Sequence, residues 1–303
     1  MTRLVWCALA ALTVLAPVRQ SPVPPGRSSV LLDAVALDRN GAPVLDLTPA
    51  DLQVRIGHFQ LPVESLELVT PDSERGARLI VLLMDDMALP LPQLARAREV
   101  ARRFIGRIAP GDQMAVVMLS DPALESTDDP AKLRRAIDRY SVKATGVLRP
   151  DQIGAHVLKT VEGIAAGLRE AGDGRKVIVG IGSGWLFDRP IPPPTAGSDL
   201  LAEWIAAMTA LSRSHAAFYA IDPGGVGSTR TDGGESGFAR ETGGRAFVNT
   251  NDLSGAVDRI LRESGSYYLI GVGNPPVGGR GLRELEIRSL RRGVVIRARR
   301  AVH

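Results

Sequence analysis

The 303-residue chain lacks several features that would define its class. Its single cysteine, Cys7, excludes a disulfide-stapled scaffold, a zinc ribbon and an iron–sulfur site. No apolar run reaches 18 residues, so we expect no transmembrane helix in the mature chain. Aromatic residues make up only 4%, yet 45% of all residues are hydrophobic. That balance is typical of a globular protein and excludes a disordered one.

Lysine is also scarce, with four residues among the 37 basic ones. The net charge is +4 at pH 7, and the basic residues are spread along the chain among 33 acidic ones. A protein that binds nucleic acid is expected to concentrate its positive charge on one face. We therefore expect no nucleic acid among the partners of this chain.

The N-terminus has the pattern of a secretory signal peptide. A positive start at residues 1–3 precedes an apolar run at 4–16, which is too short to span a bilayer. We expect residues 1–20 to be removed and residues 21–29 (SPVPPGRSS) to form a tether. The mature protein would then be exported, to the periplasm, to the cell envelope or as a secreted protein. Pro17 is unfavourable after a cleavage site, so an uncleaved anchor is the alternative.

Strand and helix patterns alternate through the middle of the chain. Continuous apolar runs are typical of strands buried on both faces of a parallel sheet, and they occur at 79–84, 114–119, 177–181 and 216–221, with a short fifth strand at 245–248. Helical spacing of apolar residues follows between them, at 94–108, 130–140, 151–168, 199–211 and 253–261. The alternation predicts an α/β fold with a doubly wound, mostly parallel sheet over residues 77–264.

The flanks of this unit show β-patterns instead. Alternating apolar residues predict strands in the N-terminal segment 30–76 and a β-hairpin in the C-terminal segment 265–303, with its turn at Arg291–Gly293. Neither flank is large enough to bury a core alone. We expect the two flanks to pack together as one small β-domain, although the α/β unit separates them in sequence.

The C-terminal segment is rich in arginine, with eight residues from Arg280 onward against Glu284 and Glu286. Charged side chains on one face of a strand commonly protect a sheet edge from pairing. The pattern favours such a solvated face, and a surface that meets an anionic partner is the alternative.

Four stretches resemble one family of exported bacterial proteins. They are Val35–Val54, Glu241–Leu253 (ETGGRAFVNTNDL), Ser266–Gly271 (SYYLIG) and the closing Val295–Arg300. All four are similar to the von Willebrand factor type A-related domain family first defined in acidobacterial proteins, over about residues 30–302. The resemblance implies a von Willebrand factor type A fold, export, a role in binding other molecules and no enzymatic activity.

The resemblance also implies a metal site, from which this sequence departs. Type A domains typically hold Mg²⁺ with an Asp-x-Ser-x-Ser motif after the first strand, a later Thr, and an Asp after a central strand. Starting the motif at Asp85 puts Met87 and Leu89 at the hydroxyl positions, and starting it at Asp86 puts Ala88 and Pro90 there.

The remaining ligand positions of the type A site depart as well. Thr145 is the only plausible Thr, and Ser183 stands where the late Asp is expected. We therefore expect no metal and no other cofactor, although Asp85 and Asp86 could still hold Mg²⁺ weakly with a few waters.

Catalytic patterns are missing too. The stretch 180–185 (GIGSGW) has Trp185 where a dinucleotide fingerprint needs glycine, and Ile181 where a nucleophile elbow needs glycine. The four histidines are far apart in sequence, which does not suit a zinc site. We predict a non-enzymatic, exported protein-binding module with a degenerate metal site. A structural component of a cell-envelope assembly is the alternative, and a hydrolase with unrecognised catalytic residues is a third.

The carboxyl ends of the parallel strands are the predicted binding site, because the loops there form the recognition crevice of an open α/β sheet. The candidate ligand-binding residues in those loops are Asp85, Asp86, Met87, Thr145, Ser183 and Trp185. We expect Trp185 to supply an apolar contact with Asp85 or Asp86 at its rim. The alternative is that Trp185 packs on the Pro-rich stretch 190–194 and closes its own loop.

Overall fold

The continuous apolar runs form a five-stranded parallel sheet in the computed structural model, which describes residues 29–143, 150–172, 174–183, 199–228, 237–274 and 282–302. In spatial order the strands are β6 (Gln113–Met118), β5 (Arg78–Met84), β7 (Arg175–Ile181), β8 (Ala216–Ile221) and β9 (Ala246–Phe247). The strand order reverses between β5 and β7, so this pair is the topological switch point of the sheet.

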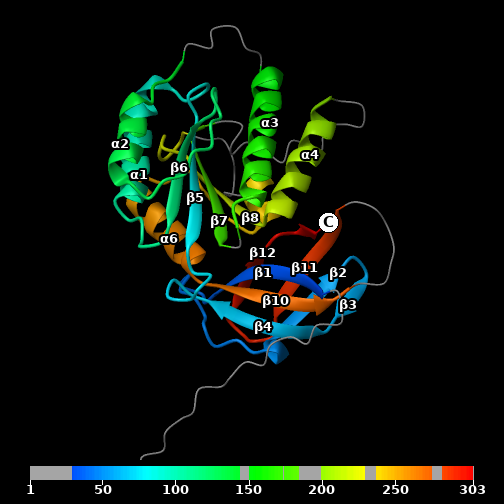
Figure 1. Cartoon of the computed structure of the whole chain (residues 1–303). Helices are drawn as coiled ribbons and strands as arrows, with labels where there is room; N and C mark the ends of the chain where they lie inside the picture. The colour runs from blue at the N-terminus through cyan, green and yellow to red at the C-terminus, as the bar shows by residue number, and fades with distance from the viewer. Residues whose placement is uncertain are drawn as a thin grey trace, which may run out of the picture.

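Helices cover both faces of this sheet (Figure 1). Successive side chains of a strand point to opposite faces, so Ile80 and Leu82 of β5 face one layer and Val81 and Leu83 face the other. The first layer consists of α1 (Leu94–Ile105), α2 (Pro130–Arg139) and α6 (Leu253–Gly265). The second consists of α3 (Pro150–Arg169), α4 (Asp199–Ser214) and α5 (Gly237–Thr242). Burial on both faces explains why the strand sequences are apolar throughout.

The two flanks form a pair of antiparallel sheets. In one sheet β1 (Ser29–Leu37) lies between β12 (Val295–Ala298) and β10 (Tyr267–Gly273), and β4 (Val63–Val69) pairs with β10. In the other sheet β2 (Leu52–Ile56) lies between β3 (Phe59–Leu61) and β11 (Arg283–Ser289), and β13 (Ala301–Val302) pairs with β11. Single 3-10 turns occur at Pro49–Asp51 and Leu91–Gln93.

Strands from the two ends of the chain are thus hydrogen-bonded neighbours, as in the β1–β10 and β2–β11 ladders. They bury one shared apolar core that includes Leu32, Val54, Ile270 and Leu285. The predicted fold class is confirmed: a doubly wound parallel sheet with a small β-domain built from both flanks.

The predicted C-terminal hairpin is wrong. Strand β11 pairs with β2 and β13, whereas β12 pairs with β1 in the other sheet. The turn at Arg291–Gly293, where Gly293 has a φ of 79°, carries the chain from one sheet to the other. Ile287 of β11 and the partly buried Ile296 of β12 pack in the same core from opposite sheets, so the arrangement buries apolar side chains of both strands.

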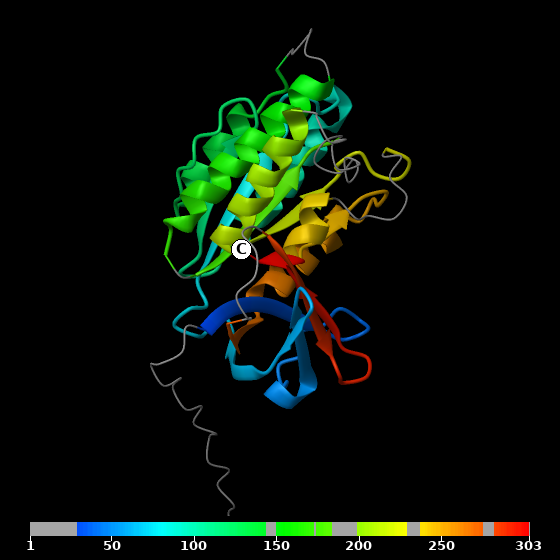
Figure 2. The same ribbon diagram turned by 90° about the vertical axis from the view of Figure 1, so that its right-hand side faces the viewer.

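The α/β unit packs against the β-domain at the amino ends of its parallel strands (Figure 2). The stretch 241–253, one of those similar to the family named above, begins at this contact. A Cβ atom on Gly244 would lie 1.8 Å from the Phe218 carbonyl oxygen, and one on Gly243 would lie 2.6 Å from the Ala298 carbonyl carbon. The Thr242 hydroxyl accepts a 2.8 Å hydrogen bond from the Phe218 N–H. Glycines are therefore needed here so that this connection fits between β8 and β12.

None of the helices within the described ranges combines the length and the apolar character that crossing a membrane requires.

Candidate functional site

Asp85 lies at the switch point, directly after β5. Its Oδ1 atom accepts hydrogen bonds from the backbone N–H groups of Met87 (3.1 Å) and Ala88 (2.7 Å), which follow it in the same loop. Its Oδ2 atom accepts one from the N–H of Ser183 (3.2 Å), just after β7. The carboxylate therefore ties the loop after β5 to the loop after β7.

Burial defines the chemistry of this carboxyl. Asp85 is only 1% exposed. Burial raises the pKa of Asp85, the backbone hydrogen bonds from Ala88, Ser183 and Met87 offset this in part, and the charge of Asp86 adds to the rise. The Tyr140 hydroxyl donates a 2.6 Å hydrogen bond to the Asp85 carbonyl oxygen. Burial, followed by the charges of Asp85 and Asp86, raises the pKa of Tyr140 far above its usual range, so this hydroxyl keeps its proton.

Two further carboxylates close loops at the same edge of the sheet. Asp86 accepts hydrogen bonds from the N–H (2.9 Å) and the hydroxyl (2.5 Å) of Ser120, and the Lys143 Nζ atom lies 3.8 Å from its Oδ2 atom. Asp222, which follows β8, accepts hydrogen bonds from the Gly224 N–H (2.7 Å) and the Ser228 hydroxyl (2.6 Å). Asp86 joins the end of β5 to the loop after β6, and Asp222 closes the loop that follows β8.

The structure brings four of the six predicted site residues together. Asp85, Asp86 and Met87 occupy one loop, and Ser183 reaches that loop with its hydroxyl, which donates a 3.2 Å hydrogen bond to the Ala88 carbonyl oxygen. Met87, however, is 8% exposed and packs in the apolar cluster shared with α3 and α4, so it offers a ligand little surface. Thr145 and Trp185 lie outside the described residues, and their part in the site stays a prediction.

The donor set at this edge does not fit Mg²⁺. That ion requires near-octahedral oxygen ligands at about 2.0–2.1 Å. Both oxygens of Asp85 face N–H donors, and the side chains of Met87 and Ala88 supply no oxygen. Over the whole described part of the chain, no three His, Cys, Asp or Glu side chains form a group that could hold a metal ion.

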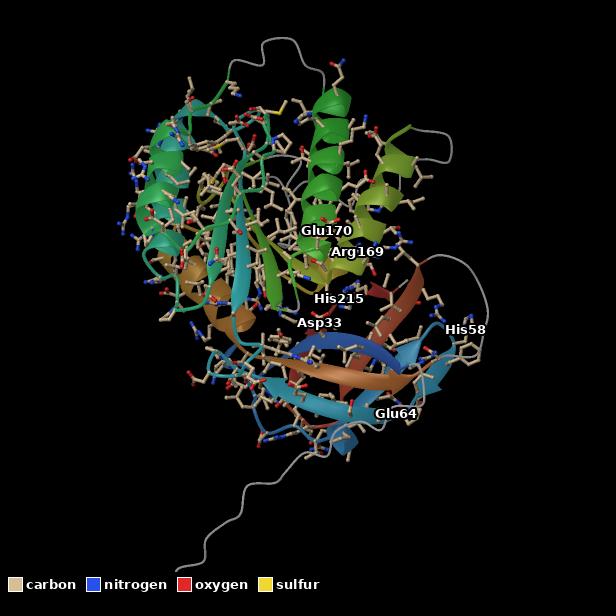
Figure 3. The ribbon with its side chains drawn as sticks, viewed as in Figure 1. Asp33, His58, Glu64, Arg169, Glu170 and His215 are labelled. Atoms are coloured by element: carbon tan, nitrogen blue, oxygen red, sulfur yellow. The ribbon has the colours of Figure 1, made fainter. Side chains whose placement is uncertain are left out.

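The histidines of the described residues are separate as well. Figure 3 shows His58 on the β-domain and His215 where the β-domain meets the parallel sheet. His156 lies in α3, where its Nε2 atom is 2.6 Å from the Leu119 carbonyl oxygen. No two of these three histidines share a site.

The sequence patterns did not predict a role for Tyr140 or Ser228. The Tyr140 hydroxyl donates to the backbone carbonyl oxygen of Asp85, and the Ser228 hydroxyl donates to the Asp222 carboxylate. The one available signal was the position of Tyr140 at the end of the predicted helix 130–140, where an aromatic side chain can fold back onto a strand end. Ser228 carries no such signal.

Comparisons with known proteins give only distant structural similarities. No family model and no curated protein matches the chain. Among solved structures, the manganese-loaded TRAP protein of Plasmodium vivax is 12% identical, with 77% of this chain and 95% of that chain covered and a TM-score of 0.40. The N-terminal domain of TFIIH p34 is 11% identical, with 62% and 99% covered and a TM-score of 0.36. Similarities this low carry no argument about function, and membership of the acidobacterial family stays a prediction.

Proposed function

We propose that this chain is an exported, non-enzymatic protein-binding module of the von Willebrand factor A type. It recognises its partner at the carboxyl edge of the parallel sheet and does so without a metal ion. The observation that carries the proposal is the Asp85 carboxylate, which joins the loops after β5 and β7 across the switch point.

The location follows from the strand order. In open α/β sheets, ligands bind outside the carboxyl ends of the strands where the order reverses. Here the two loops that flank this point are held together by Asp85 and by the Ser183 hydroxyl. A pre-organised pair of loops suits recognition, because less conformational freedom is lost on binding.

The absence of a metal from the proposal rests on the hydrogen bonds of the carboxylates. Asp85 accepts three backbone N–H groups, and Asp86 accepts the N–H and the hydroxyl of Ser120. These donors occupy most of the acceptor sites of Asp85 and half of those of Asp86, and Met87 and Ala88 add no side-chain oxygen that could complete a cation's ligand set. The acids thus hold the loops together directly, where a type A metal site would use the ion.

The proposal of a non-enzymatic module has a similar basis. A serine nucleophile needs a base that accepts its proton. The Ser183 hydroxyl donates to a carbonyl oxygen instead, and the Ser120 hydroxyl closes a loop on Asp86. Export rests on the signal-peptide pattern of residues 1–20, and N-terminal sequencing of material recovered outside the cytoplasm tests it.

A pull-down from cell-envelope extract tests the binding function. The full chain should retain a partner equally with and without EDTA, and Trp185→Ala should lose it while its melting temperature is unchanged. Phe59→Ala is the matched control, since it removes an exposed aromatic side chain from β3 in the β-domain. Retention by Trp185→Ala, or loss in EDTA, would contradict the proposed site or its independence of metal.

A further inference from the structure

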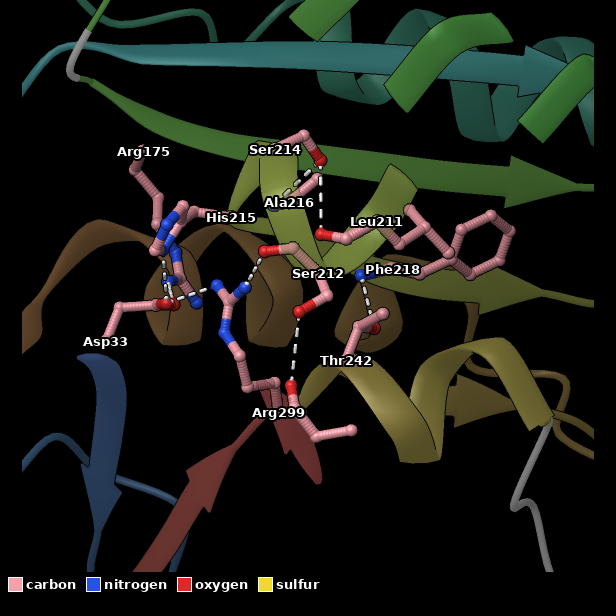
Figure 4. Close-up of polar contacts among 11 residues, drawn as sticks. Asp33, Arg175, Leu211, Ser212, Ser214, His215, Ala216, Phe218, Thr242 and Arg299 are labelled. Carbon is pink, nitrogen blue, oxygen red and sulfur yellow. Dashed lines mark hydrogen bonds and ion pairs between the residues drawn. The ribbon is translucent and has the colours of Figure 1, made fainter. Parts of the chain in front are cut away.

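A pocket of about 830 Å³ opens at the other end of the parallel sheet, where its amino edge meets the β-domain. Both parts of the molecule line it: Asp33 belongs to β1, Arg175 begins β7, His215 precedes β8 and Arg299 follows β12 (Figure 4). Arg175 and Ile181 are the two ends of β7, about 20 Å apart at ~3.3 Å per residue, and Ser183 lies beyond Ile181. The pocket is therefore separate from the carboxyl edge.

Two buried guanidinium groups share one carboxylate in this pocket. Arg175 donates to Oδ2 of Asp33 and Arg299 donates to Oδ1, while Arg299 also donates a 2.5 Å hydrogen bond to the Ser212 carbonyl oxygen. Each arginine is 5% exposed and Asp33 is 8% exposed. One negative charge against two positive charges leaves the buried group with a net charge of +1.

The electrostatics agree with this count. Burial raises the pKa of the Asp33 carboxyl, but the charges of Arg299 and Arg175 outweigh burial and hold that pKa well below its usual value. Asp33 is therefore fully ionised and supplies all the negative charge it can. The Nε–H groups of Arg175 and Arg299 are buried and have no hydrogen-bond partner within the described part of the chain.

The pocket walls add positive charge. Arg75, Arg169, Lys176 and Arg213 also line the pocket, and Asp33 is the sole acidic residue among the described lining residues. Arg75 also pairs with Glu67 at 3.5 Å, outside the lining. The net positive charge of the buried Arg175–Asp33–Arg299 group is costly unless a counter-charge offsets it, so an anion in this pocket would stabilise the arrangement.

His215 lines the pocket directly after α4. Its φ is 57°, the left-handed conformation in which helices commonly end, and it carries the chain from α4 into β8. The side chain is half exposed, and its Nδ1 atom lies 3.5 Å from Oδ1 of Asp33. Figure 3 shows His215, Arg169 and Asp33 in the same region between the helices and the β-domain.

Part of the pocket wall is apolar. Leu31 is a large hydrophobic residue that is 48% exposed, and Leu269 lies on the neighbouring strand β10 in register with Asp33. The Arg175 guanidinium lies over the Tyr267 ring in a cation–π contact, with its central carbon 5.0 Å from the ring centre. A ligand that fits this wall has an apolar or aromatic body beside its charged group.

We propose that this pocket binds an organic oxyanion, a small molecule with a phosphate, sulfate or carboxylate group. That group contacts the arginines that line the pocket, and the apolar body of the molecule lies against Leu31 and Leu269. Guanidinium groups suit such a ligand because they donate charge-assisted hydrogen bonds to oxyanions in a fixed planar geometry. The site is additional to the proposed protein-binding edge and does not depend on it.

Isothermal titration of the full chain at constant ionic strength, balanced with chloride, tests the proposal. Inorganic phosphate and phenyl phosphate should both bind saturably, with phenyl phosphate about tenfold tighter, since burial of about 50 Å² of ring is worth roughly that factor. Phenyl sulfate and benzoate are titrated in the same way, and the tightest of the three aromatic probes identifies the head group.

Variants of the pocket wall locate the binding. Arg169→Gln and His215→Asn should each weaken phenyl phosphate binding about tenfold, the effect of one lost charge-assisted contact. Asparagine tolerates a positive φ, so His215→Asn keeps the backbone conformation. Arg134→Gln on α2, outside the pocket lining, is the control and should bind as the wild type does.

Two outcomes would overturn the proposal. One is the absence of saturable binding of any aromatic probe to the wild type. The other is equal binding by the wild type and by Arg169→Gln, whose exposed side chain can be replaced without loss of folding. Direct titration is needed because phosphate and sulfate also stabilise proteins without binding, through exclusion from the surface.

Discussion

The two edges of the parallel sheet use charge in opposite ways. At the carboxyl edge, Asp85, Asp86 and Asp222 accept hydrogen bonds from backbone N–H groups and serine hydroxyls of the adjoining loops. At the amino edge, Arg175 and Arg299 meet on the single carboxylate of Asp33. In the described part of the carboxyl edge, the three acids are satisfied by loop hydrogen bonds, whereas the amino edge keeps positive charge in surplus.

The direction of the carboxyl pKa shifts follows from this difference. Asp85 is buried among neutral amides beside a like charge, so its pKa is raised. Asp33 is also buried, but two full positive charges face it and its pKa is lowered. Two buried acids of one chain can thus have opposite pKa shifts, since the charge of the groups that face each acid decides the sign.

The largest effect is expected from Asp33→Ala. This change leaves two buried guanidinium groups without their carboxylate, and breaking a buried ion pair from one side costs about 3–5 kcal/mol. Urea unfolding measures the loss in the free energy of unfolding. The control is Asp46→Ala, which removes an exposed acid paired with Arg291 at 2.7 Å and should leave stability unchanged. Equal losses of stability in the two variants would show that the buried ion pairs of Asp33 contribute no more than an exposed ion pair does.

A smaller effect is expected in the pH dependence of stability, which should have opposite signs for the acids of the two edges. Asp33 stabilises the fold above its usual pKa of 3.8, and that contribution is lost as the pH falls toward its lowered pKa. The opposite holds for Asp85, whose contribution is complete below pH 3.8 and is lost as the pH rises through its raised pKa.

Unfolding of the wild type, Asp33→Asn and Asp85→Asn between pH 3 and pH 7 measures this contrast. On acidification the wild type should lose stability relative to Asp33→Asn and gain stability relative to Asp85→Asn. The same sign for both variants would show that the surroundings of one acid have been misjudged.

The core of the fold could be predicted because its signals are local. Each parallel strand is an unbroken apolar run, and each long helix repeats its apolar residues at helical spacing. The short α5 was missed, since six residues are too few to show a period. The C-terminal hairpin was wrong because a turn signal says that the chain bends, but not which sheet each strand joins.

More of the carboxyl edge than of the amino edge could be predicted from the sequence. Asp85 and Ser183 follow apolar runs directly, and the rule for carboxyl ends of strands brings them together. The burial of Met87 could not be foreseen, because it depends on packing by α3 and α4.

The amino-edge cluster joins residues 142 and 266 positions apart. A lone acid in the apolar strand Ser29–Leu37 was its only sequence signal. Among the C-terminal arginines, Arg288 is solvated as expected, but that expectation is wrong for Arg299, which is buried by its contacts across the joint.

Two buried tyrosines test how much one hydrogen bond of a hydroxyl group contributes to stability. Both are buried in the same core cluster. The Tyr140 hydroxyl donates to the Asp85 carbonyl oxygen, so Tyr140→Phe should cost about 1–2 kcal/mol. The Tyr219 hydroxyl has no hydrogen-bond partner within the described residues, so Tyr219→Phe should cost no stability and should raise it by about 1 kcal/mol, because the change removes a buried polar group that is not hydrogen-bonded. A loss of stability in Tyr219→Phe would mean that an ordered water or a ligand satisfies that hydroxyl.

The smallest expected effect is that of divalent cations on the melting temperature. A ligand present at 100 times its dissociation constant adds about 2.7 kcal/mol to stability, so a carboxyl-edge site that the cation fills would be visible. Millimolar Mg²⁺ or Mn²⁺ should produce no such shift, because Asp85 and Asp86 already accept hydrogen bonds from five donor groups and lack the hydroxyl ligands of a type A motif. Thermal unfolding in EDTA and in each metal, at matched ionic strength, measures this. Asp85→Ala sharpens the result, since an upward shift in the wild type that disappears in this variant would mean that the cation displaces the loop amides and that the carboxyl edge is an open metal site after all.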